Sequence, residues 1–160
     1  MKVELKIRTE KHVEVFWEKT QDEEIKKLFP FTTESLEEAL KLFQETLKED
    51  ASSYGKVIYF QDRYVGDIWC YGIDEREEKM AMLSIVIFEK QLWGKGIATE
   101  ATISFLRDIF TKFNIEKVGA FVYSFNLGSI GVLKKVGFKE IEAFTEDGIE
   151  SKYFEIYKEQ

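Results

Sequence analysis

The chain has 160 residues, 44% of them hydrophobic and 15% aromatic, which is enough to bury one substantial core, so we expect a single domain over residues 1–160. A formal net charge of -7 disfavours nucleic acid as a partner, because its phosphates carry the same sign. No apolar run is long enough to cross a bilayer, no secretory signal opens the chain, and Cys70 is the only cysteine. We therefore expect a cytoplasmic protein without a membrane partner and, since there is also only one histidine, without a metal site.

The first third of the chain predicts one strand followed by two helices. Residues 5–8 read as a short strand, and from Glu10 the apolar side chains move to helical spacing. We expect a turn at residues 29–31, because a proline disfavours helix in the residue before it, and a cap from Thr32 or Thr33 on a second helix. The buried stripe of that helix should consist of Leu36, Leu40, Phe43 and Leu47.

The middle of the chain predicts strands. Residues 56–60 and 64–73 are rich in aromatic and β-branched side chains, and the polar residues 61–63 between them favour a hairpin. After a charged loop at 74–79, residues 80–88 form a nearly continuous apolar run. Such a run is typical of a central strand that is covered on both faces.

The last third predicts alternating helices and strands. The apolar spacing over residues 98–113 predicts a long helix, and residues 117–123 predict a strand. A second helix should extend from Asn126, a good N-cap, to residue 136, with Gly137 ending it. Two further strands are expected at residues 138–144 and 149–157. The whole pattern indicates a mixed α/β (α+β) sheet with helices on both faces.

Two glycines stand between the central strand and the long helix. A strand, a Gly-x-Gly turn and a helix together present free backbone N–H groups to an anion. A P-loop is excluded because Gly96, and not Ser or Thr, follows Lys95. A dinucleotide fingerprint is excluded because Thr99 stands where Gly or Ala is required.

The spacing of this segment resembles a third kind of phosphate loop. Residues 91–98 read Gln-x-x-Gly-x-Gly-x-Ala, which resembles the pyrophosphate loop of the GNAT acetyltransferase superfamily. Residues 126–138 begin with Asn126 and end in Lys-x-Gly-Phe, which resembles the second signature of that family. Residues 93–101 and 31–39 are similar to the RimJ/RimL-like branch, which acetylates amines. In element order the resemblance covers nearly the whole chain.

The resemblance implies both a fold and a co-substrate. It implies a mostly antiparallel central sheet in which two parallel strands, at 80–88 and 117–123, splay apart. The pantetheine arm of acetyl-CoA then lies in the gap as a pseudo-strand, and amides from Leu92 to Ala98 hold the pyrophosphate. The residues implied to bind acetyl-CoA are Val86, Ile87, Phe88, Gln91, Leu92, Trp93, Gly94, Lys95, Gly96, Ile97, Ala98, Thr99, Asn126 and Ser129.

The implied activity is transfer of an acetyl group to a primary amine by direct attack within a ternary complex. The amine is either a protein N-terminus or a small molecule. Leu133 stands where many relatives place a tyrosine that protonates the thiolate, and Ser129, one turn away on the same helix face, is the nearest replacement hydroxyl. The candidate bases are Asp67, Glu89 and Tyr123, and a chain of water molecules would serve as well.

Two other functions stay open at this point. The absent tyrosine is also what an acetyl-CoA sensor or scaffold without efficient catalysis would show, and an unusual phosphate loop would suit a nucleotide-binding domain. A homodimer is left open too. Five aromatic residues near the expected pocket either wall the acceptor site or pack in the core, and we expect most of them to pack: Phe29, Phe31, Trp69, Tyr71 and Tyr123.

Overall fold

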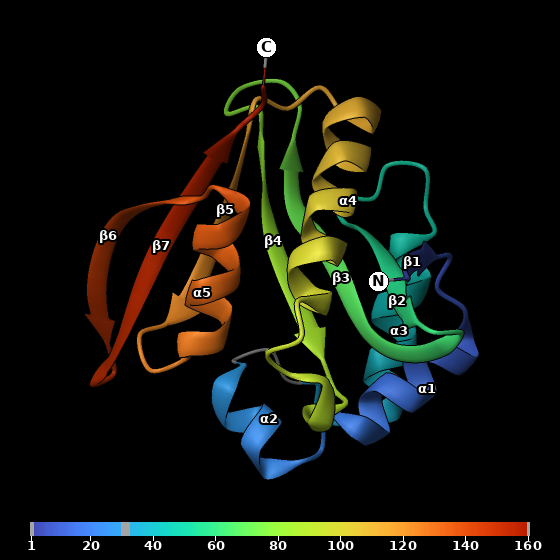
Figure 1. The fold of residues 1–160 in the computed structure, drawn as a ribbon. Helices are drawn as coiled ribbons and strands as arrows, with labels where there is room; N and C mark the ends of the chain where they lie inside the picture. The colour runs from blue at the N-terminus through green and yellow to red at the C-terminus, as the bar shows by residue number, and fades with distance from the viewer. Residues whose placement is uncertain (1, 30–32, 160) are drawn as a thin grey trace.

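The computed structural model describes residues 2–29 and 33–159. In this part of the chain one seven-stranded sheet has the order β1-β2-β3-β4-β5-β7-β6, with every neighbouring pair antiparallel except β4 and β5 (Figure 1). The strands are β1 (Val3–Lys6), β2 (Tyr54–Phe60), β3 (Arg63–Asp74), β4 (Met80–Ile87), β5 (Lys117–Tyr123), β6 (Lys139–Glu146) and β7 (Ile149–Tyr157). The predicted mostly antiparallel sheet is confirmed.

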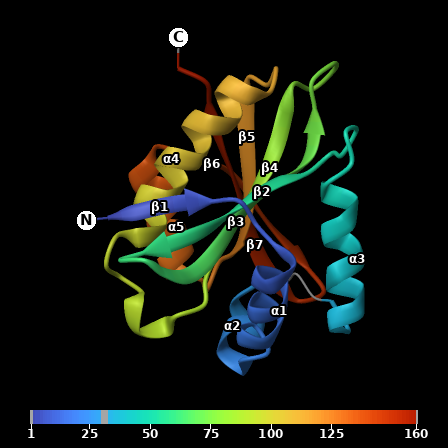
Figure 2. The same cartoon turned by 90° about the vertical axis from the view of Figure 1, so that its right-hand side faces the viewer.

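Helices cover both faces of this sheet, as predicted. One face carries α4 and α5, and the opposite face carries α1 and α3, while α2 lies near the end at which β4 finishes (Figures 1 and 2). The helices are α1 (Glu10–Lys19), α2 (Glu23–Leu28), α3 (Leu36–Thr46), α4 (Ile97–Lys112) and α5 (Leu127–Val136), with a single 3₁₀ turn at Lys90–Leu92. No helix in the described ranges is both long and apolar enough to span a bilayer.

The two parallel strands separate soon after they meet. Their ladder holds the pairs Met80↔Lys117, Ala81↔Val118 and Met82↔Gly119 and then stops. Beyond it, β4 continues to pair with β3 on its other side, and β5 with β7. The edge of β4 that faces β5 is therefore open from residue 83 onward, which confirms the predicted splay.

The hairpin between β2 and β3 shows how local sequence sets the register. Gln61 and Asp62 have φ angles of 51° and 64°, so they form a two-residue turn of the kind that matches strand twist. The turn places Phe60 opposite Arg63, and a bulge between Ile58 and Tyr59 then shifts the register by one residue, so that Val57 lies opposite Asp67. Asp67 is thereby fixed on the face of β3 that the N-terminal helices cover.

Several predicted details of the N-terminal third are wrong. The first strand ends at Lys6, so Arg8 lies beyond it, and α2 is a separate helix that the turn prediction did not include. Ser35, and not Thr33, caps α3, since its hydroxyl accepts a hydrogen bond from the N–H of Glu38 at 3.1 Å. The other predicted cap, Thr32, and the turn residues Pro30 and Phe31 lie outside the described residues.

The predicted apolar stripe of α3 is only partly buried. Phe43 is buried, Leu36 and Leu40 are half-buried, and Leu47 is 62% exposed. The reason is that α3 ends at Thr46 and leaves Leu47 as its C-cap residue, beyond the last helical turn. The stripe was predicted from spacing alone, which does not show where the helix ends.

Candidate functional site

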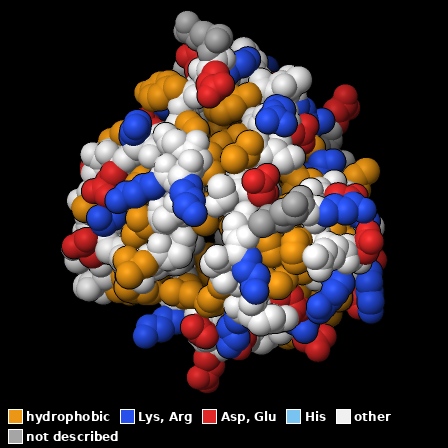
Figure 3. All heavy atoms as spheres, viewed as in Figure 1, with side chains coloured by type: hydrophobic (Ala, Val, Ile, Leu, Met, Phe, Trp, Pro, Cys, Tyr) orange, Lys and Arg blue, Asp and Glu red, His pale blue; other side chains and the backbone are white. Residues whose placement is uncertain are grey.

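A groove of about 470 Å³ runs along the end of β4 between the first turns of α4 and α5. Figure 3 shows a hollow on this face between α4 and α5, bordered mainly by uncharged atoms. The side chains and backbone that line the groove come from α2, β4, the glycine loop and the two helix starts: Leu28, Phe29, Ile85, Ile87, Leu92, Trp93, Gly94, Gly96, Ile97, Ala98, Thr99, Phe125, Asn126, Leu127, Gly128, Ser129, Gly131, Val132 and Lys135.

The glycine loop shapes one end of this groove. Gly94 and Gly96 have φ angles of 79° and 85°, in the left-handed region that glycine adopts without strain. Gly96 is the N-cap residue of α4 and offers no side chain to the first turn. The N–H groups of that turn, which have no acceptor within the helix, therefore border the groove at the positive end of the helix dipole. This end of the groove suits a phosphate.

The strand that leads into the loop presents alternate side chains to the groove. Ile85 and Ile87 line it, whereas Val86 and Phe88 are buried on the other face of the sheet against Ile25. Of the three strand residues predicted to meet the co-substrate, only Ile87 has a side chain that lines the groove. Val86 and Phe88 contribute only their backbone to this end of the strand.

Two predicted loop residues point away from the groove. The side chains of Gln91 and Lys95 are exposed and do not line it. Gln91 Nε2 instead donates a hydrogen bond of 2.9 Å to Glu89 Oε2 within the loop. Their predicted contribution is thus limited to their backbone.

The start of α5 forms the opposite wall. Asn126 is buried, its Oδ1 accepts from the N–H of Ser129 at 3.2 Å, and its Nδ2 donates to the carbonyl of Leu28 at 3.4 Å. The side chain that the sequence predicts as N-cap therefore also ties α2 to α5. Both Asn126 and Ser129 line the groove, as the resemblance implied.

A second cavity, of about 280 Å³, occupies the gap between β4 and β5. Ser129 borders both this gap and the groove, and its hydroxyl makes no hydrogen bond to a described residue. Tyr123 and Leu133 line the gap, as does Tyr71, whose pKa is raised by burial. The gap thus brings two candidate hydroxyls, Ser129 and Tyr123, next to the position where the family tyrosine is replaced by leucine.

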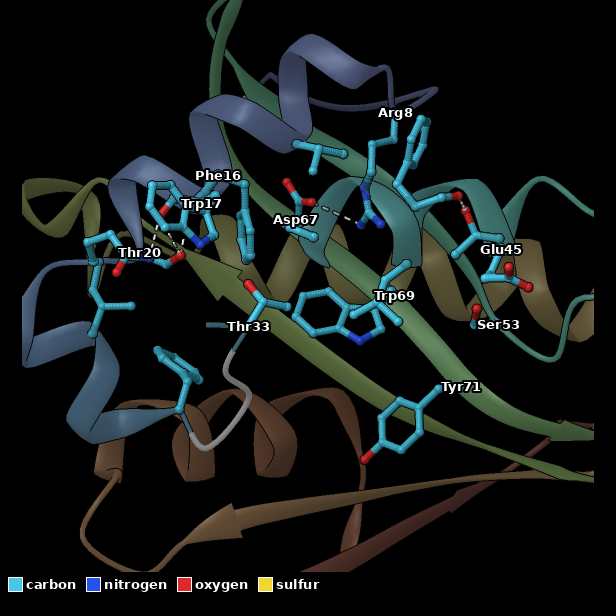
Figure 4. Close-up of a pocket in the computed structure, with 18 of the residues that line it drawn as sticks. Arg8, Phe16, Trp17, Thr20, Thr33, Glu45, Ser53, Asp67, Trp69 and Tyr71 are labelled. Atoms are coloured by element: carbon cyan, nitrogen blue, oxygen red, sulfur yellow. Dashed lines mark hydrogen bonds and ion pairs between the residues drawn. The ribbon is translucent and has the colours of Figure 1, made fainter. Parts of the chain in front are cut away.

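A third cavity, of about 460 Å³, lies between β3 and the helices α1, α2 and α3 (Figure 4). Asp67, Trp69 and Tyr71 line it in a row, because alternate residues of β3 face the same side. Trp69 and Tyr71 also line the gap, and Phe29 lines all three cavities. The third cavity is called the helix-covered pocket below. It therefore adjoins both the groove and the gap.

Asp67 lies in this pocket and not in the gap. It is 3% exposed, and Arg8 Nη2 lies 2.9 Å from its Oδ2, while the Tyr64 hydroxyl donates to its Oδ1. Burial raises the pKa of Asp67 to about 6, against the opposing effect of Arg8. Both carboxylate oxygens are therefore engaged with protein groups.

Glu89, another predicted base, lies outside this arrangement. Its side chain does not line any of the three cavities. Instead Glu89 Oε1 lies 3.7 Å from Lys19 Nζ of α1, so the carboxylate joins α1 to the loop. The Cys70 thiol is buried, and burial raises its pKa to about 12, which leaves it protonated at neutral pH.

Sequence reasoning did not single out Arg8, Trp17 or Ser84, which line these cavities. It did name Tyr71 among the aromatic residues near the expected pocket, and strand alternation places residue 71 on the same face as residues 67 and 69. Arg8 was assigned to a strand end, and nothing in a single sequence shows that the chain turns its side chain inward there.

The comparisons with known proteins agree with this geometry. A family model described as an acetyltransferase (GNAT) domain matches residues 3–139. The probable N-acetyltransferase YjcK of Bacillus subtilis (strain 168) is 29% identical over 109 residues, which is 68% of this chain and 60% of that protein. The match thus spans less than two thirds of that relative's length.

Two solved structures share the fold at low sequence identity. One is spermidine N-acetyltransferase from Vibrio cholerae in complex with CoA and spermine, with a TM-score of 0.86 at 19% sequence identity. The match covers 97% of this chain and 95% of that protein's chain. The other is RimL, a ribosomal L7/L12 alpha-N-protein acetyltransferase, with a TM-score of 0.81 at 17% sequence identity. The match covers 98% of this chain and 90% of the RimL chain. At these identities the likeness shows the fold alone.

Proposed function

This chain belongs to the GNAT acetyltransferase family, and from that membership we propose that it transfers the acetyl group of acetyl-CoA to a primary amine within a ternary complex. The observation that carries the proposal is the open edge of β4, which runs from the β4–β5 gap to the glycine-capped start of α4. One continuous groove thereby offers a strand edge to an amide-bearing arm and a helix N-terminus to phosphates.

The residues present suit acetyl-CoA. In the proposed complex the pantetheine arm lies along the open edge of β4, beside Ile85 and Ile87. The pyrophosphate lies on the free N–H groups between Gly94 and Ala98. Asn126, which already caps α5, holds the opposite wall in place.

In the proposed reaction a neutral amine attacks the carbonyl carbon of the thioester. A C–N bond forms, the C–S bond breaks, the nitrogen gives up a proton and the coenzyme A thiolate receives one. Backbone N–H groups stabilise the oxyanion that forms in between. Ser129 and Tyr123, which both border the gap, are the proposed proton donors to the thiolate.

The ammonium proton needs a separate acceptor. Asp67 and Glu89 are not assigned this role, because the first already binds Arg8 and Tyr64 and the second lies outside the three cavities. Water in the helix-covered pocket is the proposed carrier.

The position proposed for the amine substrate follows from how the cavities adjoin. The helix-covered pocket adjoins the gap through Trp69 and Tyr71, so we assign the amine substrate to it. Membership of the RimJ/RimL-like branch is part of the proposal, supported by the sequences of residues 93–101 and 31–39. A cytoplasmic location, where acetyl-CoA is available, belongs to it as well.

A second candidate function is an acetyl-CoA sensor or scaffold. It is favoured by Leu133, which is 5% exposed, lines the gap and carries no proton to donate. A sensor would keep the groove and bind acetyl-CoA without turning it over.

One pair of measurements separates these functions. Acetyl-CoA should raise the melting temperature, and coenzyme A should be released when a panel of amines is supplied. Stabilisation by acetyl-CoA without release of coenzyme A on any amine, peptide N-termini included, would favour the sensor. Stabilisation by ATP or NAD but not by acetyl-CoA would contradict both functions.

A further inference from the structure

The helix-covered pocket contains buried hydrogen-bond donors without a partner. Arg8 Nε and Nη2 and Trp17 Nε1 are buried, and none has a hydrogen-bond acceptor within the described residues. Arg8 Nη2 lies at ion-pair distance from Asp67, but the contact does not have hydrogen-bond alignment. Buried N–H groups of this kind are rare because each loses its bond to water, so an acceptor beyond the described residues is expected.

Arg8 is held in this place by its surroundings. The guanidinium extends from the segment after β1 into the pocket beside Asp67 (Figure 4). A Cβ atom at Gly55 would lie 2.8 Å from Arg8 Nη2, so the guanidinium occupies space that a larger residue at position 55 would take from it. Gly55 and Asp67 thus place the guanidinium from two sides.

The charges of the pocket do not suit a polycation. Its charged lining residues in the described ranges are Arg8, Lys26, Glu45 and Asp67, two of each sign. Asp67 is already bound by Arg8 and Tyr64, and Glu45 is exposed and 2.9 Å from Lys48 Nζ. No buried carboxylate among them is left for a second ammonium group, whereas the half-buried Arg8 and Trp17 still offer buried N–H donors.

The register of the sheet gives the span of a suitable ligand. Trp69 lies opposite Ser84 of β4 and borders the gap where acetyl transfer is proposed. Asp67, which marks the position of Arg8, is two residues further along β3, a distance of roughly 7 Å. Phe16 and Trp69 provide apolar walls between these points.

We propose that the acceptor is a primary amine with an apolar body and, about 7 Å from its nitrogen, a carboxylate or amide oxygen that Arg8 binds. Trp17 supplies a further donor to the same pocket. This inference rests on the proposed acetyl transfer and narrows its substrate class, excluding polyamines.

The test uses four amines with the same six-carbon body. They are ε-aminocaproate, ε-aminocaproamide, n-hexylamine and hexamethylenediamine, and acetylation of each is measured as kcat/KM with acetyl-CoA. We expect the two oxygen-bearing amines to exceed hexamethylenediamine by about tenfold or more, since a charge-assisted hydrogen bond is formed only with them. Arg8→Gln should remove this preference mainly through KM, and Arg107→Gln, at an exposed position on α4, should retain it.

A second variant covers the case in which Arg8→Gln does not fold, since it leaves Asp67 buried without its cation. Arg8→Gln combined with Asp67→Asn removes both charges and should lose the preference in the same way. Faster acetylation of hexamethylenediamine or spermidine by the wild type would overturn the inference and leave the proposed acetyl transfer intact.

No acetylation of any amine would instead overturn the proposed function. Calorimetric titration of ε-aminocaproate in the presence of coenzyme A then decides the ligand class independently of turnover. Binding that disappears in the Arg8 variants supports the pocket assignment, and binding that does not change in them contradicts it.

Discussion

Trp93 Nε1 donates a hydrogen bond of 2.8 Å to the carbonyl oxygen of Ile87. This bond joins the loop before α4 to the last residue of β4. It therefore fixes the position of the α4 N-terminus relative to the open edge of β4. The proposed binding of acetyl-CoA requires both at once, because the pantetheine arm lies on the first and the pyrophosphate on the second.

Replacing Trp93 by phenylalanine keeps an aromatic ring in the loop and removes the hydrogen bond to Ile87. A bond of this kind contributes about 1 kcal/mol, so we expect acetyl-CoA to bind roughly fivefold more weakly in a calorimetric titration. Tyr59→Phe is the control, since it removes a 2.8 Å contact between Tyr59 and His12 outside the three cavities. Equal affinity in the two variants would show that the loop does not need this anchor.

Gly94 and Gly148 form a matched pair for testing the phosphate loop. Both have a φ of 79°, and a Cβ added at either would meet no atom within 4 Å. Alanine at each position should therefore cost a similar stability, about 1–2 kcal/mol, from the left-handed backbone. We expect only Gly94→Ala to weaken acetyl-CoA binding, by about tenfold, because Gly148 lies in the β6–β7 turn. A similar loss in both variants would move the pyrophosphate away from the loop.

Ser129→Ala tests the proposed proton donor. If its hydroxyl protonates the thiolate, kcat should fall by about tenfold or more, while the KM for acetyl-CoA stays nearly constant. Ser124→Ala is a neighbouring control, because the Ser124 hydroxyl donates to Glu150 outside the gap. Unchanged kcat in Ser129→Ala, with a fall in Tyr123→Phe, would assign the proton to Tyr123.

The sequence was sufficient for the parts of the fold that depend on local pattern. The alternation around the Gln61-Asp62 turn, the capping residue Asn126 and the terminating Gly137 each act within a few residues, and each lies where it was predicted. The open edge of β4 was also anticipated, but only through resemblance to a family. No pattern within residues 80–88 indicates where pairing with β5 stops.

The sequence was insufficient where a side chain's role depends on distant neighbours. Asp67 was singled out as a polar residue in a strand, yet one of its oxygens pairs with Arg8, which lies far away along the chain. Its other oxygen accepts from Tyr64, three residues earlier in β3. Glu89 was singled out for its nearness to the loop along the chain, but its carboxylate pairs with Lys19. Proximity in sequence does not determine which way a side chain points.

Asp67→Asn should change how stability depends on pH. Burial raises the pKa of Asp67 to about 6 in the folded chain, so between about pH 4 and that value the folded state binds more protons than the unfolded state. Its contribution is then fully present at low pH and declines as pH rises, by at most about 1.4 kcal/mol per pH unit. Urea titrations across this range should show the decline in the wild type and not in Asp67→Asn.

The opposite sign is expected at Asp22. Its hydrogen bond to Lys90, together with the N–H of Ile25, holds the pKa of that exposed carboxyl below its usual value, so its contribution is present at higher pH and is lost on acidification. Asp22→Asn should therefore remove a contribution to stability that increases as pH rises. Asp67→Asn should remove a contribution that decreases as pH rises. If both substitutions changed the urea midpoints with the same pH dependence, the carboxyl of Asp67 would be ionised throughout, as a full ion pair with Arg8 requires.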